Sequence, residues 1–382
     1  MKTKVFVFLV AIALLAIAGF SLTYWQQSKA KAVSALPLEQ IKLPPGFKIA
    51  IYARVPNARS MVLSESGTLF VGNRSEDKVY AVQDTDGDNV ADKTYVIDKG
   101  LKMPNGVALK NGDLYVATVS TIYRYPDIEA NLGHPPTRQV VFDGYPTDTH
   151  HGWKYIAFGP DGLLYVPVGA PCNICLREDN ELYASITRLD VADPKPEVVA
   201  RGVRNTVGFD WDPHTGKLWF TDNGRDMMGD DIPPCELNVL NAAGQHYGYP
   251  FCHGGEIPDP EFGAGTSCSD YVPPVWKFGA HVAPLGMNFY RGGMFPQEYD
   301  NKIFVAQHGS WNRSRKVGYR VMAIDHDAHG ATKAVPFAYG WLDDATQKAW
   351  GRPVDVITMP DGAILVSDDY ADVIYRISYE NR

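Results

Sequence analysis

Two short apolar runs joined by a glycine-containing turn recur along the chain. In the copy at Tyr155–Val166, the apolar runs flank a turn made by Gly159-Pro160-Asp161-Gly162. Runs rich in β-branched and aromatic residues on either side of a Pro-Asp-Gly turn predict a β-hairpin. Further copies of the hairpin centre on Gly67, Gly112, Gly216, Lys302 and Gly362.

The spacing of these hairpins predicts the fold. Most copies follow one another at about 50 residues, and several continue into a further short strand, which is the periodicity of propeller blades. We therefore predict an all-β fold, a six-bladed β-propeller, in which Phe47–Ala53 pairs with Val373–Tyr379 to close the ring. A β-sandwich is the alternative, but it does not require six copies of one hairpin. The segment 225–282, rich in Gly, Pro and Asp, is expected to form a long loop over one face.

The N-terminus is predicted to lie outside this fold. Lys2 and Lys4 precede an apolar run over residues 5–22, and Tyr24 and Trp25 follow it. As a helix this run is long enough to cross a bilayer, and the aromatic pair is typical of a membrane interface. An uncleaved anchor is favoured over a cleaved signal peptide, because the small-residue sites lie late. Residues 1–35 are thus expected to anchor an extracytoplasmic, periplasmic propeller formed by residues 36–382.

Composition narrows the class of partner. The chain of 382 residues is 45% hydrophobic and 21% charged, as expected for a globular protein, and its formal net charge is -8. Nucleic-acid binding needs a concentrated basic surface. No such stretch is visible, so we expect no nucleic acid as a partner and membrane contact only through the N-terminal segment.

Five cysteines are compatible with an exported protein. Cys252 and Cys268 bracket a Gly/Pro-rich loop and are predicted to pair. Cys172 and Cys175 form a C-x-x-C that we interpret as a structural disulfide or a free pair, since the context of a redox motif is missing. Cys235 is the candidate for the odd thiol.

The acidic segment at residues 84–92 predicts a structural Ca²⁺ site. Carboxylates at alternate positions, a glycine at the turn and a later aspartate supply oxygen ligands suited to Ca²⁺. The closing Glu of an EF-hand is absent, because Tyr95 stands there, and a merely acidic turn is the alternative. The candidate ligands are Asp84, Asp86, Asp88, Val90 and Asp92.

Cationic and imidazole residues stand at the ends of several predicted strands, next to glycine. Each alone is equally well explained as turn capping or a surface ion pair. A propeller, however, gathers equivalent strand ends around one axis. We therefore expect one cationic funnel that binds a small anionic molecule, lined by His151, Arg204, His308, Arg313 and Arg352.

Several ordered motifs together resemble the sorbosone/glucose dehydrogenase family, across about residues 40–380. They are His151 before the Gly-Pro-Asp-Gly turn, Arg204-Asn205, Asp222–Arg225, His308–Arg313 and Arg352-Pro353-Val354. The segment Cys172–Cys175 is similar to the sorbosone dehydrogenase branch. The resemblance implies a six-bladed quinoprotein that uses PQQ and Ca²⁺. Such an enzyme oxidises a sugar or related aldehyde and passes electrons to an external acceptor, which is a quinone, cytochrome or dye.

The resemblance also implies roles for individual residues. His151 would be the general base and would also contact PQQ. Arg204 and Asn205 would contact the quinone of PQQ, and Arg204 would be catalytic by stabilising the charge that develops on the quinone oxygen. Asn223 would contact the cofactor too, and the backbone carbonyls of Gly224 and Arg225 would hold the Ca²⁺ bound to it. Basic residues for the cofactor carboxylates would be His308, Arg313 and Arg352.

The chain departs from the family pattern at several of these positions. Arg225 stands where the soluble glucose dehydrogenases have Pro, and His308 stands where they have Lys. Cys235 takes a place where Asp is expected, and the doublet His150-His151 offers two imidazoles, of which the spacing to the turn favours His151. Two other functions remain open: a metal-dependent propeller lactonase or hydrolase, and a non-catalytic, membrane-tethered binding module.

Overall fold

The computed structural model describes residues 36–380 of the chain. The apolar run at residues 5–22 lies outside the described residues, so the anchor stays a prediction. Within residues 36–380, no helix is long and apolar enough to cross a membrane. The compact unit Glu39–Arg382 carries the fold.

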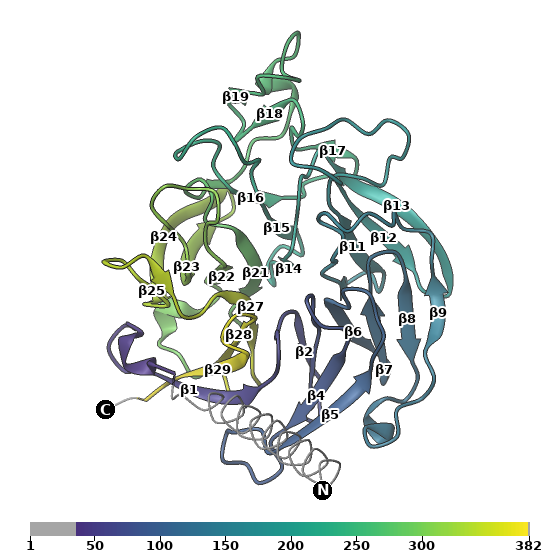
Figure 1. The fold of residues 1–382 in the computed structure, drawn as a ribbon, viewed down its shortest axis with the longest axis vertical. Coiled ribbons are helices and arrows are strands. Elements are labelled where there is room, and N and C mark those ends of the chain that lie inside the picture. Colours follow the sequence, from purple (N-terminus) through teal and green to yellow (C-terminus); the bar gives the residue numbers. More distant parts are fainter. Residues whose placement is uncertain (1–35, 381–382) are drawn as a thin grey trace, which may run out of the picture. The chain divides into compact units, whose positions relative to one another are not determined.

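Six antiparallel sheets follow one another around a ring (Figure 1). Each sheet is one blade, whose strands run in order from the inner to the outer edge. Blade 1 contains β2 (Met61–Leu63), β3 (Leu69–Val71), β4 (Val79–Gln83) and β5 (Lys93–Asp98). Blade 2 contains β6 (Gly106–Lys110), β7 (Asp113–Ala117), β8 (Ile122–Tyr125) and β9 (Gln139–Phe142). Blade 3 contains β10 (Ala157–Phe158), β11 (Leu164–Val168), β12 (Ser185–Asp190) and β13 (Asp193–Arg201), extended by the parallel strand β17 (Gln245–His246).

The other three blades complete the ring. Blade 4 contains β14 (Phe209–Trp211), β15 (Leu218–Asp222), β16 (Glu236–Val239) and β20 (Trp276–Lys277). Blade 5 contains β21 (Pro284–Phe289), β22 (Ile303–Gln307), β23 (Arg320–Asp327) and β24 (Gly330–Tyr339). Blade 6 contains β27 (Pro353–Thr358), β28 (Ile364–Asp368), β29 (Val373–Tyr379) and β1 (Phe47–Arg54). The predicted six-bladed propeller is therefore confirmed, and each predicted turn joins the first two strands of a blade.

The first strand of the described chain closes the ring. β1 pairs antiparallel with β29, from Phe47 opposite Tyr379 to Arg54 opposite Val373, as predicted. The Phe47 ring packs against four aromatic rings, including those of Phe295 and Phe337. The distances between ring centroids are 4.7–5.2 Å. Blade 6 is thereby built from both ends of the propeller.

The segment 225–282 differs from its prediction as one long loop. It contributes β16 and β20, the third and fourth strands of blade 4, as well as β17. Strands of two to four residues are too short to show alternation in a stretch rich in Gly and Pro. The rest of the segment holds the hairpin of β18 (Cys252–His253) and β19 (Ile257–Pro258), which is seen at the top of Figure 1.

The remaining short elements connect the blades. Among residues 36–380 the helices are single turns of 3₁₀ type, namely η1 (Leu38–Gln40), η2 (Glu129–Asn131), η3 (Cys268–Asp270) and η4 (Gln297–Tyr299). The hairpin of β25 (Leu342–Asp343) and β26 (Lys348–Ala349) lies between blades 5 and 6 in the chain.

The inner strands approach one another closely at the axis. A Cβ atom on Gly286 would lie 2.2 Å from the carboxylate of Asp355, and one on Gly208 would lie 2.3 Å from the carbonyl oxygen of Leu285. Only glycine fits where two backbones approach this closely. Apolar side chains fill the spaces between neighbouring blades, so the core forms a series of clusters around the ring. This packing holds the strand ends that carry the functional side chains.

Candidate active site

A cavity of about 560 Å³ lies where the ends of strands from five blades converge. Its lining residues come mainly from the segments that enter the inner strands or leave the second strands. In an antiparallel sheet, the start of the first strand and the end of the second strand lie side by side. Residues far apart in the sequence therefore meet at this end of the blades. We call this space the axial cavity. It is lined by His151, Arg204, Asn205, Asn223, Gly224, His308 and Arg352 from the predicted set.

Within residues 36–380, one ring nitrogen of His151 has no hydrogen-bond partner. Its Nδ1 lies 2.8 Å from the carbonyl oxygen of Ala170, so Nδ1 carries the hydrogen and donates it, and Nε2 keeps its lone pair. Burial lowers the pKa of His151 well below 6.5, and the nearby charge of Arg204 acts in the same direction. The imidazole is therefore neutral at pH 7 and can accept a proton at Nε2.

The backbone places His151 in an uncommon conformation with φ of 50°. The opposing strand end makes room for it at Gly169, where a Cβ atom would lie 2.5 Å from the His151 Cβ. The His150 ring is adjacent, with 4.1 Å between the ring centroids, and also lines the cavity. His150 is exposed whereas His151 is buried, so the two imidazoles of the doublet have different surroundings.

Arg204 is buried and held by the protein on several sides. Its Nε donates to the carbonyl oxygen of Asn173 at 2.8 Å, and Nη2 donates to Asn173 Oδ1 at 2.9 Å. Nη1 donates to the carbonyl oxygen of Asn223 at 3.1 Å, and Nη2 lies 3.4 Å from the carboxylate of Asp226. These contacts leave one N–H of Nη1 without a protein partner among residues 36–380.

Asp222 holds the backbone of the Arg204-Asn205 pair. Its two carboxylate oxygens accept from the backbone N–H of Arg204 at 2.8 Å and of Asn205 at 2.6 Å. Burial raises the pKa of Asp222 to about 6. The Asn223 side chain in turn donates to the carbonyl oxygens of Asn205 and Pro284. Blades 4 and 5 are thereby tied together at the cavity.

His308 and Arg352 lie beside an acidic residue that no sequence motif had indicated. Asp369 accepts from His308 Nε2 at 2.7 Å and from Arg59 Nη1 at 2.5 Å. Burial opposes the charge of Asp369, but His308, Arg59 and Arg352 hold its pKa well below the usual range. Burial lowers the pKa of His308 to about 4. The positive charge of the cavity at neutral pH therefore comes from its arginines.

Arg59 and Arg74 of blade 1 also line the axial cavity and were missed from the sequence. The Arg74 guanidinium lies 3.9 Å over the Trp153 ring, and burial lowers its pKa to about 10. Within residues 36–380, no hydrogen bond or ion pair holds this guanidinium. The signal was present: Arg74 follows the second strand of its blade just as Gly224 and His308 follow theirs.

The two residues predicted to hold the cofactor Ca²⁺, Gly224 and Arg225, have different surroundings. Gly224 lines the axial cavity, whereas the Arg225 side chain turns to an acidic cluster and pairs with Asp259 at 2.5 Å and Glu261 at 3.1 Å. The nearby Cys235 lines the cavity as a buried thiol, and burial raises its pKa to about 11.

The cysteines of the described chain pair largely as expected. Cys252 is bonded to Cys268, as predicted. Cys172 is bonded to Cys175, which decides between the disulfide and the free pair that the sequence left open. Cys235 is the free cysteine among residues 36–380, as predicted.

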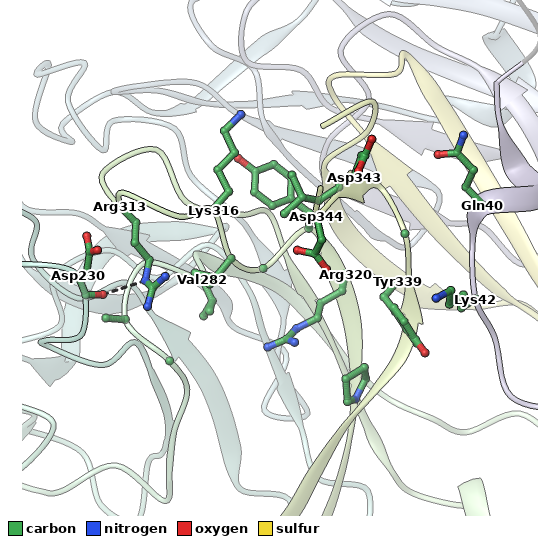
Figure 2. A pocket seen from close by; sticks show the side chains of 18 of the residues that line it. Gln40, Lys42, Asp230, Val282, Arg313, Lys316, Arg320, Tyr339, Asp343 and Asp344 are labelled. Atoms are coloured by element: carbon green, nitrogen blue, oxygen red, sulfur yellow. Dashed lines mark hydrogen bonds between the residues drawn. The ribbon is translucent and has the colours of Figure 1, made fainter. Parts of the chain in front are cut away.

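Arg313 lies outside the axial cavity, contrary to the expected funnel. Its guanidinium donates to the carbonyl oxygen of Asp230 at 3.0 Å and to the carboxylate of Asp231 at 2.8 Å, and it lines a second cavity (Figure 2). Arg313 comes well after Gln307, the end of β22, so the intervening loop carries it away from the strand end.

The acidic segment between β4 and β5 gathers three of its five candidate ligands. One carboxylate oxygen each from Asp84, Asp86 and Asp88 lie within 4.8 Å of one another. Asp92 instead accepts from the hydroxyl and backbone N–H of Thr85. None of these residues lines the axial cavity.

The sequence matches a known protein family over nearly the whole propeller. The family model described as TrAA12-like matches residues 41–380. An uncharacterized protein of Borreliella burgdorferi is 34% identical over 355 residues, covering 89% of this chain and 91% of that protein. The pyrroloquinoline quinone-dependent sugar dehydrogenase of Hypocrea jecorina is 27% identical over 305 residues, covering 66% of this chain and 69% of the relative.

Solved structures share the fold. The calcium structure of a Trichoderma reesei family AA12 enzyme has a TM-score of 0.78 at 21% identity, covering 89% of this chain and 97% of that chain. The holo form of the pyranose dehydrogenase PQQ domain from Coprinopsis cinerea has a TM-score of 0.75 at 18% identity. The match covers 88% of this chain and 97% of that chain. The predicted resemblance to PQQ-dependent sugar dehydrogenases is thus confirmed. On the match over nearly the whole propeller, the chain belongs to the TrAA12-like family.

Proposed function

We propose that the chain is a PQQ-dependent dehydrogenase that oxidises an aldose or a related aldehyde or alcohol and passes the electrons to an external acceptor. The observation that carries this proposal is the axial cavity, where the free Nε2 of His151 lies among guanidinium groups. Two disulfides in the described chain fit an oxidising compartment, in keeping with an extracytoplasmic location.

The residues of the cavity fit the cofactor. Its volume of about 560 Å³ lies in the range of small-molecule sites, and its lining holds four arginines against one carboxylate, that of Asp226. PQQ carries carboxylates, which guanidinium groups bind well in a fork. The proposed carboxylate ligands are Arg352 and Arg74, whose guanidinium has no hydrogen bond or ion pair among the described residues.

The remaining roles follow from the free atoms of the cavity side chains. When bound, PQQ supplies the carbon that accepts the hydride of the substrate. His151 Nε2 takes the proton from the substrate hydroxyl, and the hydrogen bond from Nδ1 to Ala170 fixes the orientation of the ring. The free N–H of Arg204 and the amide of Asn205 stabilise negative charge on a neighbouring oxygen.

The backbone at Gly224 fits a cation. Among the described backbone hydrogen bonds, none ends on the carbonyl oxygens of Gly224 or Arg225. Carbonyl oxygens without a donor are suitable ligands for a hard cation such as Ca²⁺. We therefore assign these two oxygens to the proposed Ca²⁺ of the cofactor site.

The alternatives fit less well. A hydrolase with a metal on the propeller axis needs several carboxylate or imidazole ligands free to coordinate. In the described lining, Asp226 lies against Arg204 and His281, and His308 is bound to Asp369. A non-catalytic binding module would have the same propeller but would not turn over a substrate. Only an activity measurement therefore separates it from an enzyme.

The test is a titration of the purified chain with PQQ, with and without Ca²⁺. We expect Ca²⁺-dependent binding, seen as increased thermal stability, together with reduction of a dye by at least one sugar of an aldose panel. Binding without turnover on sugars, aldehydes and alcohols would support the binding module. Absence of PQQ binding in both conditions would overturn the proposal.

A further inference from the structure

A second cavity of about 940 Å³ lies beside the axial cavity. Residues that precede β1, the loop after β22 and the β25–β26 hairpin contribute to its lining. Figure 2 shows Arg320 extending into this space, with Lys42 and Lys316 also among its lining residues. None of the proposed cofactor ligands of the axial cavity lines it.

A thin wall separates the two cavities. Val282 lines the second cavity, whereas its neighbours His281 and Ala283 line the axial cavity. The Tyr319 ring lines the second cavity and lies 5.5 Å from the guanidinium carbon of Arg352 in the axial cavity. A ligand in the second cavity would therefore contact the wall of the proposed cofactor site.

Four aspartates line the second cavity: Asp230, Asp231, Asp343 and Asp344. Asp231 pairs with Arg313 at 2.8 Å, and Asp230 accepts from the backbone N–H and the hydroxyl of Ser314. Asp343 accepts from the hydroxyl of Thr346 at 2.7 Å and from backbone N–H groups of its own turn. Asp344 is exposed and lies 3.9 Å from Arg315. Of the four carboxylates, therefore, only that of Asp231 is closely paired with a cation among the described residues.

Four cationic residues, Lys42, Arg313, Lys316 and Arg320, equal these aspartates in number. Arg320 Nε donates to Gln307 Oε1 at 2.8 Å, but its two Nη atoms have no hydrogen bond or ion pair within residues 36–380. The ammonium groups of Lys42 and Lys316 also lack a carboxylate partner in this part of the chain. Burial lowers the pKa of Arg320 and the charge of Asp344 opposes this shift, so the guanidinium is partly removed from water. The cavity thus has no excess of positive charge, but within the described residues the two Nη groups of Arg320 are open to a ligand.

We propose that the second cavity is a binding site for a small oxyanion-bearing molecule, with a carboxylate or a phosphate held by the Arg320 fork. A planar guanidinium with both Nη groups free matches two oxygens of either anion. Lys42 and Lys316 add charge but no fixed geometry. This site is separate from the proposed cofactor cavity and does not depend on the proposed reaction.

The test measures binding of inorganic phosphate and of succinate, each alone, to the full chain by calorimetry. We expect saturable binding of at least one probe, and which one binds distinguishes phosphate from carboxylate ligands. Arg320→Gln is expected to weaken binding at least tenfold, and Arg320→Lys, which keeps the charge without the fork, is expected to weaken it less.

Two further variants locate the bound anion. Arg54→Gln, at an exposed arginine outside the cavity lining, and Arg74→Gln, in the axial cavity, are expected to leave the affinity unchanged. Absence of saturable binding by both probes, or binding that survives in Arg320→Gln, would overturn the proposal. Loss of binding in Arg74→Gln alone would assign the anion to the axial cavity and overturn it as well.

A different observation concerns the loop closed by the Cys172–Cys175 disulfide. Asn173 lies inside this loop and bridges blade 3 to blade 4. Its backbone oxygen and Oδ1 both accept from Arg204, and its side chain also bonds the backbone of Asp226, with Oδ1 accepting at 2.8 Å and Nδ2 donating at 3.0 Å. Asn173 therefore fixes the guanidinium plane of Arg204.

We infer that Asn173 is a positioning residue that acts through Arg204, and that the disulfide holds it in place. This inference rests on the proposed function for its effect on turnover. Arg204 lowers the pKa of His151, so a displaced guanidinium also changes the titration of that imidazole. The second effect can be measured without any cofactor.

The experiment therefore follows the His151 ring by NMR through a pH titration of the full chain without cofactor. Asn173→Ala is expected to raise the pKa of His151, to weaken PQQ binding several-fold and to lower kcat. Asn173→Asp keeps the Oδ1 acceptor, so its His151 pKa, PQQ affinity and kcat are expected to lie between those of Asn173→Ala and the parent. Asn180→Ala, which removes a hydrogen bond in the segment that follows the disulfide, is the control. An unchanged His151 titration in Asn173→Ala would overturn the inference. If the titration changes but the parent chain binds no PQQ, the proposed function fails and the positioning of Arg204 stands.

Discussion

At the scale of single residues, hydrogen-bond partners separate side chains that look equivalent in the sequence. His150 and His151 are adjacent, yet His151 is the buried one and has its Nδ1 bonded to Ala170. Arg74 and Arg313 both follow a strand end, yet only Arg74 enters the axial cavity. Charge, burial and orientation together decide which groups can do chemistry.

The first prediction at this scale concerns the proposed base. His151→Ala is expected to lower kcat by about 10²- to 10⁴-fold, the range lost when a general base is removed, while the Kd for PQQ changes only a few-fold. His150→Ala is the matched control and is expected to keep most of the activity. Steady-state kinetics and cofactor titration check both variants, and a dead His150→Ala beside an active His151→Ala would contradict the assignment.

The second prediction concerns Lys154, a buried lysine. Among the described residues its Nζ donates a hydrogen bond only to the carbonyl oxygen of Gly152, at 3.2 Å. Burial lowers the pKa of Lys154 from 10.5 to about 7. Between these values the unfolded chain binds more protons than the folded chain, so this group makes stability rise with pH, by at most about 1.4 kcal/mol per pH unit.

Lys154→Met is expected to remove that slope. Denaturant unfolding at about pH 7.5, 8.5 and 9.5, within the window between the two pKa values, measures the free energy of unfolding of both proteins. The exposed Lys195→Met is the control and should keep the slope of the parent. Parallel slopes for Lys154→Met and the parent would contradict the prediction.

At the scale of elements, turns decide where charges gather. The loop between β4 and β5 brings Asp84, Asp86 and Asp88 together and leaves Asp92 on Thr85. Three carboxylates this close repel one another unless a cation joins them. The structure thus brings together three of the five predicted ligands, and the Ca²⁺ site stays a prediction.

Ca²⁺ is expected to stabilise the protein through this loop in the absence of PQQ. A roughly 100-fold excess over Kd corresponds to about 2.7 kcal/mol of stabilisation. Thermal unfolding with and without Ca²⁺ measures the effect, which Asp86→Asn should reduce strongly. Asp193→Asn, at the exposed start of β13, should respond like the parent. Equal stabilisation in Asp86→Asn would assign the ion to another site.

At the scale of the whole molecule, ring closure links the two ends of the propeller. β1 is the outer strand of blade 6, and the Phe47 ring packs against aromatic residues of blade 5 and of β29. Closing the ring leaves no blade without a neighbour, and it holds the strand ends around the axial cavity in register.

Phe47→Ala should therefore destabilise the packing of blade 6 against blade 5. Because the ring is half-buried, we expect a loss of about 2 kcal/mol in the free energy of unfolding, below the roughly 3–5 kcal/mol of a fully buried Phe. Denaturant unfolding checks this value. Lys48→Ala, next on the same strand and exposed, should change it by less than about 0.5 kcal/mol. Equal losses in the two variants would contradict the role of the Phe47 ring.

Local patterns were sufficient to predict much of this protein. The Pro-Asp-Gly and Asn-Gly turns between β-rich runs predicted the blade hairpins, because turn residues and strand alternation act over a few neighbouring positions. Their repetition predicted the ring and its closure by β1 and β29. The motifs around His151 and Arg204 were also visible, and with them the family.

Other features depended on contacts between segments far apart in the chain. The short strands β16 and β20 exist because blade 4 offers them pairing partners, not because their sequences show alternation. Arg74 lines the axial cavity and Arg313 lies outside it, although both carry the same charge near a strand end. Asn173 reaches Arg204 only because the Cys172–Cys175 loop lies against blade 4.

The sequence by itself thus determined the repeated hairpins and their order around the ring, because the causes of a turn and of a short strand are local. Only the tertiary structure decided which charged groups are paired and which are free, because that depends on burial and on partners brought from other blades.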